Sequence, residues 1–201
     1  TIEEREEYEP HIEAGTIVYA GVDYEKILRA AEKEADVILW DGGNNDFPFC
    51  KPDLLITVAD ALRPGHEISY YPGEVCARLA DAVVINKIDS ATKENIEIVK
   101  KNISAINPQA KIFLGKMPFK IEGKPKGKVL VVEDGPTLTH GGLSIGAGSF
   151  SLKKYGGKII DARKYAVGSI KDVYNRYKHL KMELPAMGYS KKQLKELEIT
   201  I

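Results

Sequence analysis

Short apolar runs alternate with amphipathic stretches along this chain, and that alternation restricts its fold more than any other feature. The runs 54–59 and 82–86 have the length of a buried strand, and the stretch that follows Ser90 has apolar residues at helical spacing. Because a helix must carry the chain back between parallel strands, this order favours an α/β fold. We expect a three-layer, mostly parallel sheet with helices on both faces. The expected strands are 36–41, 54–59, 82–86, 111–114, 129–132 and 158–161, and the expected helices are 24–31, 72–80, 90–107, 147–155, 169–179 and a last one from 190.

The most informative motif follows one of these runs, where Asn86, Lys87 and Asp89 come directly after the apolar residues 82–85. In nucleotide-binding α/β proteins, ligands lie at the carboxyl ends of the strands. A carboxylate only accepts hydrogen bonds, so Asp89 can take two from guanine, whereas adenine would leave it with a repulsive contact. The motif thus predicts a base-binding loop. The alternative reading is a strand end that leads into a capped helix.

A second motif, 45 residues upstream, follows the apolar run 36–40. Asp41 is the expected Mg²⁺ carboxylate, with Asp46 as a second candidate, and Gly42 and Gly43 allow backbone N–H groups to approach a phosphate. Asp46 has an alternative role as the cap of a turn, and the whole motif has one as a tight turn. This motif and the base-binding loop follow each other along the chain in the order expected for one nucleotide site. Together they predict that the first binds the magnesium ion and the second binds the base.

The sequence contains no Gly-x-x-x-x-Gly-Lys-[Ser/Thr], the loop that holds the phosphates of ATP or GTP in many enzymes. The chain also starts with Thr1. We therefore expect a piece of a longer protein, in which an upstream strand and phosphate loop complete the sheet.

Four further side chains lie in loops that follow expected strands. Arg63 and His66 are candidates for binding a substrate phosphate, and His140 is a candidate phosphate ligand or proton donor. Lys116 is placed to touch the base from the loop after 111–114. Ordinary loop polarity is the alternative for each of them, and a solvated lysine is the alternative for Lys116.

A segment rich in glycine, proline and lysine, 120–128, divides the chain. We expect residues 1–119 to carry the nucleotide motifs and residues 129–201 to form a C-terminal α/β unit that extends the same sheet.

The composition excludes several partners. Lysine plus arginine and aspartate plus glutamate both number 29, so no net charge favours nucleic acid or an anionic membrane. The apolar runs are too short to span a bilayer, no signal peptide is visible, and the two cysteines lack metal-ligand spacing. These features predict a cytoplasmic protein, which can be an oligomer. The richness in lysine and glutamate is typical of hyperthermophiles.

Several stretches together resemble the archaeal cyclic 2,3-diphosphoglycerate synthetase family and its relatives described as GTPases, a group that is P-loop NTPase-like. The resemblance covers essentially the whole chain. It rests on the segments 40–49, 63–67, 70–74, 86–89, 132–141 and 184–189.

The resemblance implies a nucleotide-dependent ligase that uses ATP or GTP with Mg²⁺. Its substrate would be a small anionic phosphorylated compound, 2,3-diphosphoglycerate, closed into an internal phosphoanhydride, with Arg63, His66 and His140 on its phosphates. The residues of the base-binding motif suit guanine, whereas the synthetase after which the family is named uses ATP. Both ATP and GTP therefore stay as alternatives for the nucleotide. The alternative is a GTP-binding protein or GTPase of unknown partner, of which this chain is a piece that is inactive alone.

Overall fold

The structure is a computed structural model that describes residues 2–42, 47–118, 121–139 and 141–201, and of residues 2–7 it describes the backbone only. Gly43, Asp46 and His140 lie outside the described residues. The chain forms two compact units, Thr1–Met117 and Pro118–Ile201.

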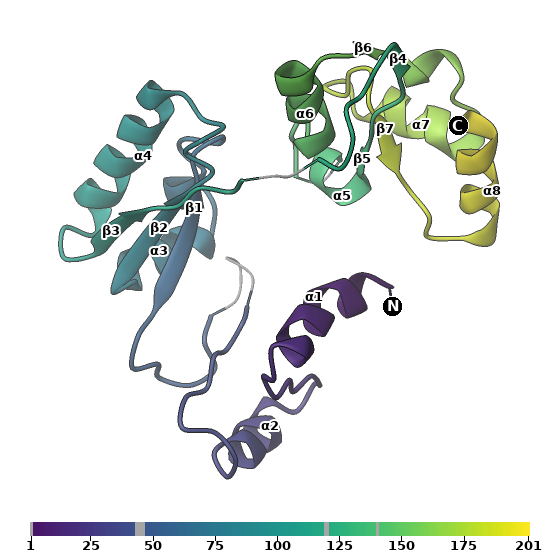
Figure 1. Ribbon diagram of the computed structural model, residues 1–201. Coiled ribbons are helices and arrows are strands. Elements are labelled where there is room, and N and C mark those ends of the chain that lie inside the picture. The colour runs from purple at the N-terminus through teal and green to yellow at the C-terminus, as the bar shows by residue number, and fades with distance from the viewer. Residues whose placement is uncertain (1, 43–46, 119–120, 140) are drawn as a thin grey trace. The chain divides into compact units, whose positions relative to one another are not determined.

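A three-stranded parallel sheet organises the first unit, in the order β1 (Ile56–Asp60), β2 (Ala82–Asn86) and β3 (Lys111–Leu114) (Figure 1). The expected strands 82–86 and 111–114 are confirmed, and the strand expected at 54–59 begins and ends slightly later. The helices of this unit are α1 (Ile2–Glu13), α2 (Tyr24–Ala31), α3 (Gly73–Leu79) and α4 (Lys93–Ile106), with a 3-10 turn η1 (His66–Ile68).

One face of this sheet is covered by α3 and α4. Val83 and Ile85 of β2 pack there against Val99 and Ile103 of α4, and all four side chains are fully buried. The helix α4 begins at Thr92, whose hydroxyl accepts a hydrogen bond from the Asn95 N–H. The parallel α/β fold, similar to that of P-loop NTPases, is thus confirmed.

The opposite face carries the alternate side chains of the strands. Ile56, Val58 and Phe113 are 53%, 44% and 54% exposed there, because side chains along a strand point to the two faces in turn. Where the structure describes the chain, this face lacks the helical layer expected from the sequence.

The strand expected at 36–41 is not formed. This segment has no regular secondary structure, and Val37 and Leu39 are 75% and 87% exposed. A run of β-formers becomes a strand only where a neighbouring strand bonds to it, and none of the described strands pairs with these residues. The interpretation of Asp41 as the end of a buried strand is therefore wrong for this structure.

The second unit contains four short strands that pair in parallel as two separate ladders, β4 with β6 and β5 with β7. Its core includes Ala162, Ile170, Leu184 and Met187. The elements are β4 (Lys128–Val129), β5 (Val132–Asp134), α5 (Gly135–Leu138), α6 (Ala147–Tyr155), β6 (Lys158–Ile159), η2 (Ala162–Lys164), α7 (Gly168–Arg176), β7 (Leu184–Ala186) and α8 (Lys191–Thr200).

One expectation for this unit needs correction. The apolar run 129–132 does not form one strand, because it is divided between β4 and β5, which have different partners. The last helix begins where the sequence predicts it, and the Ser190 hydroxyl caps it by accepting a hydrogen bond from the Gln193 N–H.

Buried carboxylates organise the interior of the second unit. Glu133 is 6% exposed, and its side chain accepts hydrogen bonds from the N–H groups of Gly146, Gly148 and Ser149 at the start of α6. The Ser149 hydroxyl donates to Glu183 Oε1 at 2.7 Å, and Glu183 is 4% exposed. Glu133 thereby caps α6 from the neighbouring strand.

Candidate nucleotide site

Three loops meet at the carboxyl edge of the sheet in the first unit. The register pairs Asp60 of β1 with Asn86 of β2, and Ile85 of β2 with Leu114 of β3. Because all three strands are parallel, their following loops emerge at one edge, where ligands of open α/β sheets bind. The predicted base-binding residues, Lys116 and Arg63 are therefore brought to the same edge.

The base-binding loop has a specific backbone conformation. Lys87 has a φ of 61°, in the left-handed region that residues with a side chain adopt rarely. The Asn86 side chain supports this conformation, since its Oδ1 accepts a hydrogen bond of 2.8 Å from the Lys87 N–H. Strained residues of this kind cluster at ligand-binding sites, so the conformation agrees with a binding role for the loop.

The loop after β3 is bonded to the base-binding loop. The Met117 N–H donates to Asp89 Oδ1 at 3.1 Å, and the Ile88 N–H donates to the Gly115 carbonyl at 3.1 Å. A Cβ atom at Gly115 would lie 2.9 Å from Asn86 Oδ1, so only glycine allows the two loops this close approach. Asp89 is thus held in place while its side chain stays exposed, and Lys116 lies exposed between the two bonded residues.

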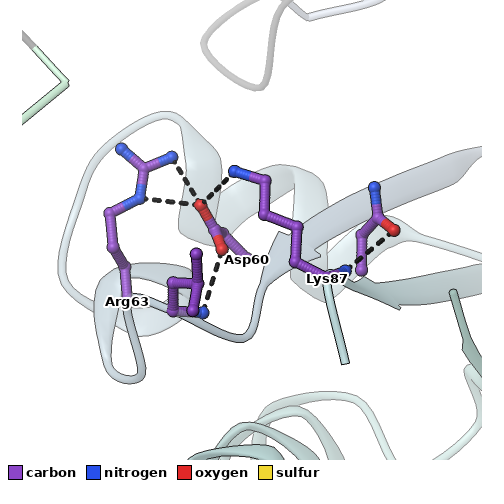
Figure 2. A network of polar contacts seen from close by, with 5 residues as sticks. Asp60, Arg63 and Lys87 are labelled. Atoms are coloured by element: carbon purple, nitrogen blue, oxygen red, sulfur yellow. Dashed lines mark hydrogen bonds and ion pairs between the residues drawn. The ribbon is translucent and has the colours of Figure 1, made fainter. Parts of the chain in front are cut away.

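Asp60 forms the centre of a polar cluster at this edge (Figure 2). Its Oδ2 accepts a hydrogen bond from the Lys87 ammonium at 2.9 Å. The same oxygen contacts the Arg63 guanidinium, with Nε at 3.0 Å and Nη2 at 2.9 Å. Its Oδ1 accepts the Leu62 N–H at 2.9 Å. One carboxylate therefore holds two of the cationic side chains that the sequence proposed for ligand binding.

The same contacts set the charge state of Asp60. Burial alone raises the pKa of a carboxyl group, but the hydrogen bonds from Lys87 and Leu62 and the charges of Lys87 and Arg63 outweigh it, so the pKa of Asp60 is lowered. Asp60 is consequently ionised at neutral pH.

Arg63 and His66 lie in the turn that follows β1. Arg63 is bound to Asp60, and the exposed His66 ring packs edge-on against Tyr70, with 4.8 Å between the ring centroids. Glu67 shapes the turn by accepting bonds from the Gly65 N–H and the Asn102 amide. Arg63 is therefore tied to Lys87 through Asp60, whereas the ring of His66 packs against Tyr70.

The proposed magnesium residues are only partly described. Asp41 and Gly42 are exposed, and a Cβ atom at Gly42 would lie 3.0 Å from the Trp40 ring. Within the described residues no group of three His, Cys, Asp or Glu side chains could hold a metal ion. Mg²⁺ at a nucleotide keeps several waters and needs one or two carboxylates beside the phosphates, so a single exposed Asp41 fits that role.

Asp60 was missed by the sequence interpretation, which ended its strand at Ala59. The available signal was its position at the end of an apolar run, three residues before Arg63. The pairing with Lys87, 27 residues away, has no sequence signature.

The parallel sheet and its polar carboxyl edge define a P-loop NTPase-like α/β protein, and sequence comparison gives the particular family. Residues 13–115 match the model of the cyclic 2,3-diphosphoglycerate synthetase P-loop domain, and the chain belongs to this family. The match ends at Gly115, just before the boundary between the two units.

Relatives extend this finding. Arginine synthetase ArcE of Thermococcus kodakarensis is 62% identical over 206 residues, which is 100% of this chain and 46% of the relative. Cyclic 2,3-diphosphoglycerate synthetases of Thermococcus sibiricus and Pyrococcus furiosus are 36% and 29% identical over 53% and 60% of this chain, and 25% and 27% of their own length. The chain therefore spans less than half of each of these relatives, and its relatives are synthetases.

No described helix has the length and apolar character needed to cross a membrane.

Proposed function

We propose that the protein carrying this chain is a synthetase that couples formation of arginine to cleavage of a nucleoside triphosphate bound with Mg²⁺. The observation that carries the proposal is the 62% identity to arginine synthetase ArcE over both units, including the residues after 115 that the family model does not reach. Residue identity at this level across a whole chain favours a shared reaction.

The residues of the first unit would bind the nucleotide. Asp89 would accept hydrogen bonds from the base, the Lys87 stem would lie along the ring, and Lys116 would approach from the adjacent loop. Asp41 would hold Mg²⁺ through water, and the metal would neutralise the phosphate charge during transfer. Arg63 is the further cation at this edge.

The direct test uses the reverse reaction, because the name of the relative specifies only the product. The protein at its natural length is incubated with L-arginine, phosphate and Mg²⁺, together with ADP or GDP. We expect the guanidinium carbon of arginine to exchange one amine for a phosphate oxygen, so that ammonia leaves, a ureido product forms and the phosphoryl group passes to the diphosphate. Mass spectrometry measures the loss of arginine and the ureido product, and phosphorus NMR measures the matching triphosphate. Arginine that is stable with both nucleotides, under conditions where the protein binds them, contradicts the proposal.

A second candidate function is closure of 2,3-diphosphoglycerate into its cyclic phosphoanhydride. It is favoured by the family model over residues 13–115 and by the names of the two relatives at 36% and 29% identity. Incubation with 2,3-diphosphoglycerate and Mg-ATP or Mg-GTP would then give a cyclic product in phosphorus NMR. Phosphate released from GTP without either product would indicate a GTPase.

The base preference is tested separately. If Asp89 reads guanine, Asp89→Asn should weaken GTP binding and favour xanthosine triphosphate, because the amide donates to the extra carbonyl of xanthine. Titrations with ATP, GTP and xanthosine triphosphate give the ranking. An unchanged ranking shows that Asp89 does not read the base.

A further inference from the structure

Asp60 is the acidic centre of the polar cluster at the loop edge, and the nucleotide site proposed above gives it no role. Its side chain is 14% exposed, and its Oδ2 lies 2.9 Å from Lys87 Nζ and 2.9 Å from Arg63 Nη2. An anion in this position would repel a nucleotide phosphate, so direct contact with the ligand is not its role.

The contact of Asp60 with Lys87 gives it an indirect role. A lysine side chain has many rotamers, and ordering it when a ligand binds costs free energy. Asp60 fixes the ammonium of Lys87 across the β1–β2 pair, while Asn86 fixes its backbone at a φ of 61°. The Lys87 stem is then ordered at the carboxyl edge before any ligand arrives.

Arg63 makes this arrangement compatible with an anionic ligand. Two cationic side chains share one carboxylate oxygen, so the three groups together carry one net positive charge. The cluster orders Lys87 and still attracts the negative charge of a nucleotide.

We propose that Asp60 is a positioning residue for nucleotide binding, which acts through Lys87 and does not touch the nucleotide. This inference rests on the proposed nucleotide-dependent function. The competing explanation is that Asp60 only shapes the turn after β1, where its Oδ1 accepts the Leu62 N–H.

The two explanations differ in their coupling to Lys87, which a double-mutant cycle measures. Asp60→Asn keeps an amide oxygen for Leu62 and removes the charge. Lys87→Met keeps the stem and removes the ammonium. Dissociation constants for Mg-GTP and Mg-ATP are determined by calorimetric titration of the natural-length protein and of the two single variants and the double variant.

We expect Asp60→Asn to weaken binding of the preferred nucleotide about tenfold, which corresponds to 1.4 kcal/mol. In the Lys87→Met background the same change should alter the dissociation constant by less than about twofold. An equal loss in both backgrounds, or no loss in Asp60→Asn alone, overturns the inference.

Two further variants separate positioning from folding. Glu97→Gln removes the charge of another paired carboxylate, on α4 and 2.6 Å from Lys100, and should leave both dissociation constants unchanged. Asp60→Glu keeps the charge and should bind more tightly than Asp60→Asn at equal thermal stability. Glutamate that is no better than asparagine overturns the inference.

Nucleotide binding by the parental protein separates failure of this inference from failure of the proposed function. If it binds neither nucleotide, the proposed function fails and the inference fails with it. If it binds a nucleotide and the cycle shows independent effects, only the inference fails.

Discussion

The two units of this chain hold their buried carboxylates in different ways. In the first unit, Asp60 sits at the carboxyl edge of a parallel sheet and is held by two cationic side chains. In the second, Glu133 and Glu183 are more deeply buried and are held by N–H and O–H donors, and none of the ion pairs between described residues involves them.

The two kinds of partner differ in how firmly they tie a carboxylate to the framework of its unit. Backbone N–H groups at a helix start cannot leave without unfolding that helix, so Glu133 is part of the framework of its unit. The lysine and arginine side chains around Asp60 come from loops at the edge of the sheet and are partly exposed, so loss of this cluster should cost less stability. Four substitutions test the distinction.

The largest effect is expected for Glu133→Ala. The change leaves three backbone N–H groups without an acceptor in a buried site, and the free energy of unfolding of the second unit should fall by about 3 kcal/mol or more. Urea unfolding followed by circular dichroism measures this. Glu198→Ala, on the exposed part of α8, is the matched control. Equal stabilities of the two variants would show that Glu133 is not part of the framework.

A comparable loss of about 3 kcal/mol is expected for Ile103→Ala in the first unit, for a different reason. Ile103 is fully buried against the sheet, and its truncation leaves a cavity under β2. Hydrogen exchange should show faster opening of β2 and α4. A uniform change in both units would mean that they unfold together.

A smaller effect is expected for Asp60→Asn, about 1 kcal/mol at neutral pH, because the pairs of Asp60 are partly exposed. The lowered pKa of Asp60 sets its pH dependence. Its contribution is present above the ordinary value of 3.8 and is lost as the pH falls through the lower pKa of the folded state. The difference between parental protein and variant should therefore shrink below about pH 4 in acid titrations of stability. A difference that grows on acidification contradicts this assignment.

The smallest effect is expected for Glu183→Gln, below about 1 kcal/mol. Glu183 Oε2 is buried without a hydrogen-bond partner among the described residues, so removal of the charge relieves part of a desolvation cost. The retained amide oxygen can still accept from Ser149. A loss as large as that of Glu133→Ala would mean that the charge of Glu183 is itself required.

Local signals predicted the parts of the fold that are set by neighbouring residues. The strand 82–86 and the helices that begin near residues 90 and 190 follow from apolar periodicity and from hydroxyl side chains at helix starts. The position of the base-binding loop follows directly from that strand. These features depend on residues within a few positions of one another.

Contacts between distant residues decided the rest. Nothing near Asp60 shows that Lys87 is its partner, and nothing near Glu133 shows that it accepts from residues 146–149. The run 36–41 has strand propensity, but propensity alone does not supply a neighbouring strand. The sequence therefore predicted the positions of the strands and loops of the first unit better than it predicted the contacts between distant side chains.

The exposed apolar side chains of Val37, Leu39, Ile56 and Val58 also affect how the chain behaves as a sample. Exposed apolar side chains attract further copies of the chain, and salts such as ammonium sulfate strengthen that attraction. Light scattering from the 201-residue chain should thus rise with protein concentration and with sulfate. Dilute solutions without such salts are therefore the conditions in which ligand titrations of the chain should be made.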